Sequence, residues 1–251
     1  METIARLVYK MAAVMTPGLC LGMAAATLVH VPAEAQERIL SSQEGGVGAA
    51  PTELRPFAPA HPKRARFLGV LPSGGVRQTA DWVVDSDDNG SLPFLIVDKK
   101  DAKVFVFDVQ GHLLGAAAAL VGLANGDDTV PGIGTRPLSK IRPEERTTPA
   151  GRFVASLGND LGKLDVLWVD YDAGISLHRV VKGTAKEHRA QRLATQTPLD
   201  NRVSFGCINV PVEFFDRIVH TVFTGTKGVV YILPEIKSMP QVFPAFYRVE
   251  E

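Results

Sequence analysis

Short apolar runs separated by turn residues dominate the chain from about residue 93 onward, and they restrict it to a fold built mainly from β-strands. The runs are rich in valine, isoleucine and aromatic residues and are bounded by glycine, proline, asparagine and aspartate, a pattern typical of strands. We predict strands at residues 94–97, 103–107, 112–120, 152–156, 165–171, 175–181 and 228–233. The first two are joined by a short turn and form a hairpin. We therefore expect a mostly β domain in which most strands pair antiparallel.

One substantial helix is predicted, from about residue 211 to 223. Pro211 suits a first helical turn. Apolar residues then recur at the i, i+3, i+4, i+7 spacing of one buried face; they are Phe215, Ile218, Val219 and Val222. Residues 182–196 are charged and tolerate a helix, so we expect a surface insertion there. Beyond Pro234 we expect a loosely packed tail.

The first 35 residues read as a secretory signal peptide. The basic residues Arg6 and Lys10 precede an apolar stretch at 11–29, and Ala33-Glu34-Ala35 provides a small-x-small cleavage site. An uncleaved membrane anchor is the alternative, and the cleavage site disfavours it. We therefore predict export to the periplasm or cell envelope, with no membrane association after cleavage.

The remaining chain divides into four segments. We assign residues 36–64, which are rich in Gly, Pro, Ala and Glu, to a flexible tether, 65–92 to an N-terminal extension, 93–236 to the main folded domain and 237–251 to a C-terminal tail. The 27 basic and 27 acidic residues balance, which argues against a nucleic-acid partner. One cysteine in the mature chain excludes an intramolecular disulfide.

That cysteine, Cys207, lies in the stretch Ser204-Phe205-Gly206-Cys207-Ile208-Asn209-Val210. An unpaired thiol in an exported chain is unusual. It is either a buried small hydrophobe or a nucleophile. Gly206 favours the second reading because it permits a tight turn and close backbone approach. Ser204 and Asn209 are small polar residues suited to such a turn.

A cysteine nucleophile needs a base. His178 ends an apolar strand, which is a rigid place to present one. His188 lies among charged residues typical of a solvated helix face. We take His178 as the base and keep His188 as the alternative. With backbone N–H groups of Gly206 and Cys207 as oxyanion donors, this set predicts acyl transfer through a thioester.

Two other classes of site are disfavoured. No Cys/His cluster has the ligand spacing of a metal site, and we expect neither metal nor cofactor. A papain-like peptidase usually has its histidine after the cysteine, where only His220 stands here. That residue falls next to buried Val219 on the predicted helix and points largely to solvent.

The stretch Ser204-Phe205-Gly206-Cys207 resembles the Ser/Thr-His-Gly-Cys signature of L,D-transpeptidase catalytic domains, the YkuD family. The segment from Thr148 to Phe153 matches that family's Thr-Pro-x-Gly-x-Phe, and Trp168 followed by Leu177-His178 resembles its aromatic strand and apolar-His strand end. The resemblance extends over roughly residues 93–234. It implies a β-sandwich or mixed-sheet domain with one helix after the cysteine.

The resemblance also implies an activity. Such enzymes act on peptidoglycan stem peptides: the cysteine attacks the carbonyl of the third residue, a diamino acid, and releases a terminal D-alanine. The acyl group passes to an amine of another stem peptide, to an envelope protein or to water. By position, Cys207 is the nucleophile, His178 the base, and Ser204 the support of the turn. Arg202, Asn209 and Trp168 are candidates to bind substrate.

The sequence departs from the family pattern at three points. Phe205 replaces the family's histidine, which removes a polar neighbour of the thiol and keeps open a catalytically silent peptidoglycan-binding module. An L,D-carboxypeptidase is a further alternative. Twenty-five residues separate His178 from Ser204, whereas 15 separate His188 from it, closer to the usual gap. Asn209 stands where many members have arginine.

Overall fold

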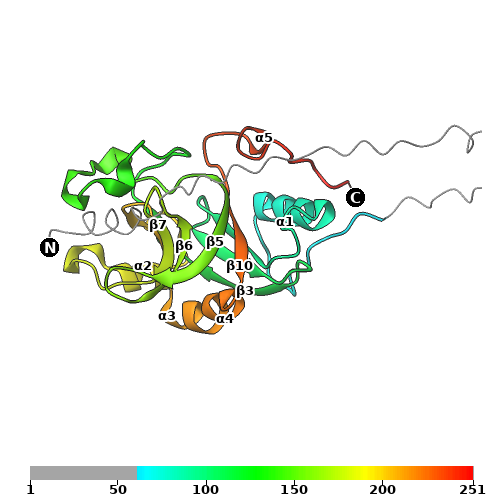
Figure 1. Cartoon of the computed structure of the whole chain (residues 1–251), viewed down its shortest axis with the longest axis horizontal. Coiled ribbons are helices and arrows are strands. Elements are labelled where there is room, and N and C mark those ends of the chain that lie inside the picture. The colour runs from blue at the N-terminus through cyan, green and yellow to red at the C-terminus, as the bar shows by residue number, and fades with distance from the viewer. Residues whose placement is uncertain (1–60, 251) are drawn as a thin grey trace, which may run out of the picture. The chain divides into compact units, whose positions relative to one another are not determined.

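A mixed sheet of eight strands forms the centre of the structure, a computed structural model that describes residues 61–250 (Figure 1). The strand order is β3-β2-β1-β10-β5-β6-β7-β9. Neighbours run antiparallel except for two parallel pairs, β1 with β10 and β7 with β9. The mostly β, mostly antiparallel prediction is confirmed. The predicted signal peptide and nearly all of the tether lie outside the described residues.

The strands fall close to their predicted positions. They are β1 (Phe94–Asp98), β2 (Lys103–Phe107), β3 (Leu113–Ala118), β5 (Gly151–Asn159), β6 (Asp165–Asp170), β7 (Ile175–Arg179) and β10 (Lys227–Ile232). Three short strands were not predicted. One is β9 (Ile208–Val210), which pairs with β7 at the edge of the sheet. The other two, β4 (Val121–Gly122) and β8 (Arg202–Ser204), form a separate parallel pair. The loop between β4 and β5 contains three short 3-10 helices, Ile133–Thr135, Leu138–Lys140 and Pro143–Glu145.

The central strands are buried on both faces, and the two faces carry different residues. Alternate positions point to opposite sides of a sheet. One face receives aliphatic side chains, among them Leu95, Val97, Val104, Val106, Val230 and Ile232. The other receives mainly aromatic ones, including Phe94, Phe105, Phe107 and Tyr231. Such two-sided burial requires a covering layer on each face.

The helical segment after β9 covers the aliphatic face. It runs through α3 (Val212–Phe214), a π-helical turn (Phe215–Val219) and α4 (His220–Phe223). Phe215 and Val219 are fully buried, and Ile218 and Val222 pack against the same core. The prediction of a helix at 211–223 is thus confirmed.

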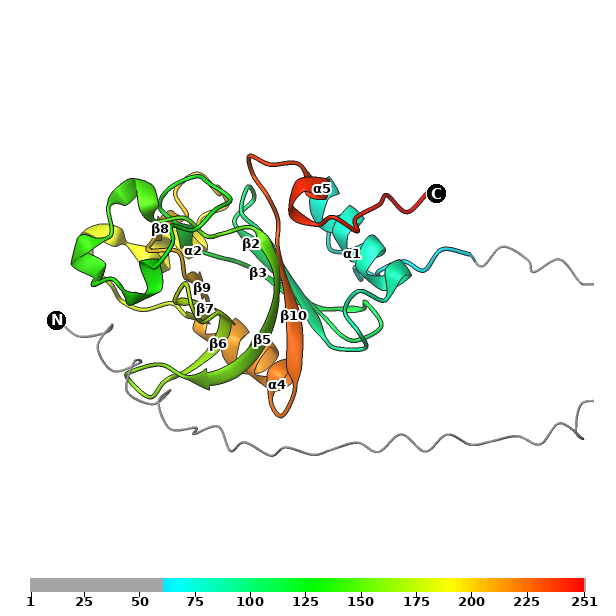
Figure 2. The ribbon, with the colours of Figure 1, turned by 45° about the horizontal axis from the view of Figure 1, so that its top comes forward.

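A second long helix, α1 (Gly74–Ser86), covers the aromatic face and was not predicted. Ser73 caps it, because its hydroxyl oxygen accepts a hydrogen bond from the Val76 N–H at 3.2 Å. Trp82 is 1% exposed and donates from its indole to the Ala245 carbonyl at 3.1 Å. Figure 2 shows α1 and α5 (Met239–Val242) together on one side of β10.

The C-terminal segment is more tightly packed than its sequence indicates. Phe243 is 2% exposed and its ring lies 6.0 Å from those of both Trp82 and Tyr231. Phe246 contacts Trp82 at 5.6 Å between ring centroids. The expectation of a loose tail is therefore wrong, because aromatic residues spaced along it fill the gap between α1 and the sheet.

The charged insertion predicted at 182–196 forms a 3-10 turn (Ala185–Glu187) followed by α2 (Arg189–Ala194). Within residues 61–250, no helix is both long and apolar enough to cross a membrane.

Phe243→Ala tests the packing of this segment. We expect the free energy of unfolding to fall by about 3 kcal/mol, because truncating a buried aromatic leaves a cavity. Ile236→Ala is the control, since Ile236 is 72% exposed in the same segment and should change little. Urea unfolding measures both; equal effects would contradict the assignment of Phe243 to the core.

Candidate active site

Cys207 lies in a tight turn between β8 and β9, held by the side chain of Ser204. The Ser204 hydroxyl accepts a hydrogen bond from the Gly206 N–H at 3.0 Å and donates to the Cys207 carbonyl at 2.6 Å. Gly206 has φ of +128°, and a Cβ there would lie 2.7 Å from the Thr147 carbonyl oxygen. Only glycine fits this position, and the turn leaves Cys207 partly exposed as a residue.

Thr148 fixes the same turn from a different part of the chain. Its hydroxyl donates to the Gly206 carbonyl at 2.7 Å and accepts from the Gly122 N–H at 2.8 Å. The residue is 1% exposed. We did not predict Thr148 as a site residue, although it begins the Thr-Pro-x-Gly-x-Phe segment that carried part of the resemblance.

His178 reaches the thiol because β7 and β9 pair in parallel. The register places His178 beside Asn209, two residues after Cys207. The Nδ1 atom lies 2.7 Å from the Arg179 carbonyl oxygen. A carbonyl can only accept, so Nδ1 carries a proton. Nε2 is the remaining ring nitrogen, and the imidazole lies close enough to the Cys207 side chain for each group to shift the pKa of the other.

Ser176 is a further neighbour of the thiol that we did not predict. Its hydroxyl lies 3.7 Å from the Cys207 Sγ, and both its hydroxyl and its backbone N–H help to lower the pKa of the thiol. The Gly174 carbonyl lies 3.5 Å from Sγ. Ser176 precedes His178 by two positions, and this same-face spacing is the one sequence signal that would have indicated it.

The cysteine and histidine shift each other's protonation in opposite directions. Burial raises the pKa of the Cys207 thiol, but the hydrogen bond and charge of His178, together with Ser176, outweigh it, so the pKa lies below its ordinary value. Burial lowers the pKa of His178, and the hydrogen bond and charge of Cys207 raise it above its usual value. This pair favours thiolate and imidazolium.

One backbone donor stands free beside the thiol. The Gly206 N–H, predicted as an oxyanion donor, is engaged by Ser204 in this structure. The Cys207 N–H has no acceptor among residues 61–250. Cys207 itself is therefore the donor that the turn offers to an oxyanion.

The ring of Phe205 packs against the cationic side chain of Arg146. The Arg146 guanidinium carbon lies 4.0 Å above the centre of its ring, a cation–π distance. Arg146 also donates to the Ile141 carbonyl at 3.1 Å. Phe205 thus ties the turn to the loop that precedes β5, and His178 remains the histidine that contacts Cys207.

The three residues predicted to bind substrate have different surroundings. Arg202 is paired with Glu235 and also contacts the Ala124 carbonyl at 3.2 Å. Asn209 is fully buried; its side chain accepts from Arg189 at 2.9 Å and donates to the Cys207 carbonyl at 3.3 Å. Both side chains are therefore engaged within the protein and support the site internally.

Trp168, the third residue predicted to bind substrate, has different surroundings from Arg202 and Asn209. It is partly exposed and stands directly across β6–β7 from Ser176. Directly opposed residues share one face of a sheet, so Trp168 borders the face that carries Ser176 and His178.

His188, the alternative base, lines a separate pocket with α2.

Comparisons with known proteins give distant matches. No family model and no curated protein matches the chain. Among solved structures, the L,D-transpeptidase from Xylanimonas cellulosilytica is 12% identical over 57% of this chain and 60% of its own, with a TM-score of 0.34. LdtMt1 in complex with imipenem is 15% identical over 56% and 58%, with a TM-score of 0.34.

The catalytic domain of the E. faecium L,D-transpeptidase is 16% identical over 56% of this chain and 95% of its own, with a TM-score of 0.30. The matched region spans less than two thirds of the first two structures. All three are described as members of the family that the Cys207 signature resembles. Because the likeness is distant, the chemistry of the site rests on its own geometry.

Thiol alkylation as a function of pH tests the Cys207–His178 pair. Since the Cys207 pKa is lowered, the wild-type thiol should react with iodoacetamide at pH values where an ordinary cysteine is protonated. His178→Ala removes the hydrogen bond and charge but leaves the burial, so the midpoint should move to higher pH. His188→Ala should match wild type; a shift in that variant alone would move the base to His188.

Thr148→Val tests the support of the turn. The substitution leaves the buried Gly122 N–H and Gly206 carbonyl without their partner, which costs about 1–3 kcal/mol of unfolding free energy. Thr148→Ser keeps the hydroxyl and should retain most of that stability. Equal losses in both variants, measured by urea unfolding, would show that the methyl group and not the hydroxyl matters.

Proposed function

We propose that this protein is a cysteine acyltransferase of the L,D-transpeptidase type. The observation that carries the proposal is the Cys207–His178 pair: a cysteine, partly exposed as a residue, whose thiol pKa is lowered by a neighbouring imidazole of fixed tautomer. A thiolate with an oriented base is the machinery of nucleophilic acyl transfer. Opposed pKa shifts concentrated in one site are typical of catalytic groups.

The reaction follows from the positions of these groups. Cys207 Sγ, as thiolate, attacks the substrate carbonyl carbon, and the carbonyl oxygen becomes an oxyanion near the Cys207 N–H. The tetrahedral intermediate collapses by breaking the C–N bond, and the leaving amine takes the proton from His178 Nε2. The product is a thioester on Cys207 and a free amine.

The second half of the reaction regenerates the enzyme. An acceptor amine loses a proton to His178 and attacks the thioester carbon. The C–S bond breaks, the new amide forms, and thiolate and imidazolium are restored. With water as the acceptor, the same steps give a carboxylate, which is the L,D-carboxypeptidase reaction.

The substrate we propose is a peptidoglycan stem peptide that loses a terminal D-alanine. The Cys207 signature and the Thr148–Phe153 segment support this choice, as does the predicted export to the cell envelope. Trp168, partly exposed on the face that carries Ser176, offers an apolar surface against which a peptide can lie. An envelope protein is a second class of acyl acceptor consistent with this chemistry.

Product analysis tests the proposal. The mature protein and its Cys207→Ala variant are each incubated with tetrapeptide muropeptides, and products are identified by mass spectrometry. We expect D-alanine release and cross-linked dimers with the wild type only. Tripeptide alone would indicate an L,D-carboxypeptidase. Intact tetrapeptide after incubation with folded wild-type protein would contradict the proposal and favour a silent peptidoglycan-binding module.

A further inference from the structure

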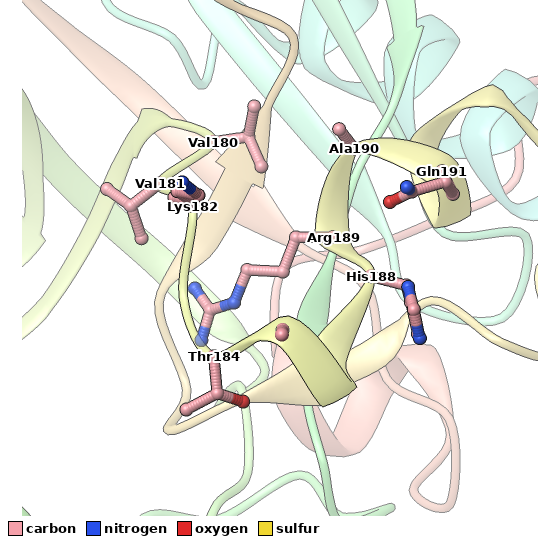
Figure 3. A pocket seen from close by; sticks show the side chains of 9 residues that line it. Val180, Val181, Lys182, Thr184, His188, Arg189, Ala190 and Gln191 are labelled. Carbon is pink, nitrogen blue, oxygen red and sulfur yellow. The ribbon is translucent and has the colours of Figure 1, made fainter.

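A pocket of about 490 Å³ opens where the chain leaves β7 and enters α2 (Figure 3). Its walls are the segment after His178 on one side and the start of α2 on the other. The lining residues that matter for its chemistry are Val180, Lys182, Thr184, His188 and Arg189. The charged insertion predicted at 182–196 therefore does more than cover the surface, because it shapes a cavity.

Arg189 is the most buried charge in this pocket. It is 9% exposed, and Figure 3 shows its guanidinium between the segment at Val180–Lys182 and Thr184. Its Nε donates to Glu187 at 2.6 Å and its Nη1 to Asn209 at 2.9 Å. Nη2 donates to no group within the described part of the chain. A buried guanidinium with a free donor facing a cavity is a binding group for an anion.

The pocket adjoins the reacting groups. Val180 follows His178 by two positions, and its N–H donates to the Val210 carbonyl at 2.8 Å, so the strand pairing continues past β7. His178 and Val180 therefore point to the same face. Asn209 links the two sites, since it bonds Arg189 on one side and the Cys207 carbonyl on the other.

The charge of the lining selects an anion. Lys182 and Arg189 are cationic, and no carboxylate residue lines the pocket. Glu187, the nearest acid, contacts the Nε edge of Arg189 and leaves Nη2 unoccupied. Arginine binds carboxylates through directed hydrogen bonds as well as charge, which makes a carboxylate the ligand that fits best.

We propose that this pocket binds a free carboxylate at the far end of the diamino acid side chain in the stem peptide. The inference rests on the proposed function, which places the carbonyl of that residue at Cys207. Its side chain then extends past His178 toward Arg189. The pocket makes the protein selective for a diamino dicarboxylic acid over the same residue with an amide, or without the carboxylate.

Two tetrapeptides that differ only in a carboxylate or an amide at this position test the proposal. The readout is the ratio of kcat/KM for D-alanine release from the two peptides. We expect wild type to favour the carboxylate peptide by about tenfold or more, the size of a charge-assisted hydrogen bond. Arg189→Gln should bring the ratio close to one.

The ratio separates recognition from structural damage, because losing the Asn209 contact would slow both peptides alike. Lys186→Gln is the matched control: it removes one positive charge from the same segment, but Lys186 does not line the pocket, and the ratio should stay at the wild-type value. Lys182 lines the pocket but does not contact Asn209, so Lys182→Gln should lower the ratio only in part. An unchanged ratio in Arg189→Gln would overturn the proposal.

Peptide binding to the Cys207→Ala variant tests the pocket independently of the reaction. Calorimetry should show tighter binding of the carboxylate peptide, with the preference lost in the Cys207→Ala/Arg189→Gln double variant. If this binding preference appears but the wild type turns over neither peptide, the result contradicts the proposed reaction and supports the proposed carboxylate pocket. Equal binding of the two peptides would overturn the pocket, whatever the turnover.

Discussion

The parallel pairing of β7 with β9 is the interaction on which the site depends. It sets Leu177 against Ile208 and His178 against Asn209, so that two segments about thirty residues apart meet with a histidine and a cysteine on one face. Parallel strands need a long connection, and the insertion containing α2 supplies it. The same connection also forms the Arg189 pocket. His178 and Ser204 are separated by more residues than in the family pattern, and these additional residues build the pocket.

A buried polar network holds the turn around Cys207 from behind. Lys99 is fully buried at its amine, which contacts Asp127 at 2.7 Å and the Thr148 carbonyl at 3.0 Å. Burial raises the pKa of Asp127, but backbone N–H groups led by Lys237, together with Lys99, bring it down to about 2. Because a buried charge is costly without partners, this network fixes the Thr148 backbone, and the Thr148 hydroxyl in turn fixes Gly206. The C-terminal segment after β10 is thereby joined to the site.

Seven strands of the sheet and the helix at 211–223 were predictable because their apolar residues recur regularly and each buries a continuous face, whereas the short strands β4, β8 and β9 were not. Helix α1 was not, since its apolar residues are few and its partner is a C-terminal segment more than 150 residues away. Local context indicated Cys207, His178 and Ser204 as members of one candidate site, and the structure brings them together. The two-residue spacing from His178 could have pointed to Ser176, and Thr148 begins a segment that carried part of the resemblance. Arg189 had no such signal, because only the packing of the loop brings it to Asn209. Arg202 and Asn209 show the converse: both are polar residues near Cys207 in sequence, and both side chains are engaged within the fold.

The central claim is that Cys207 carries the acyl group covalently while His178 moves the protons. The most direct measurement is the intact mass of the protein after brief reaction with a tetrapeptide and an acid quench, followed by peptide mapping. The account predicts a mass increase equal to the tripeptide acyl group, located on Cys207, and absent from Cys207→Ala. An adduct on another residue, or D-alanine release by the Cys207→Ala variant, would contradict it.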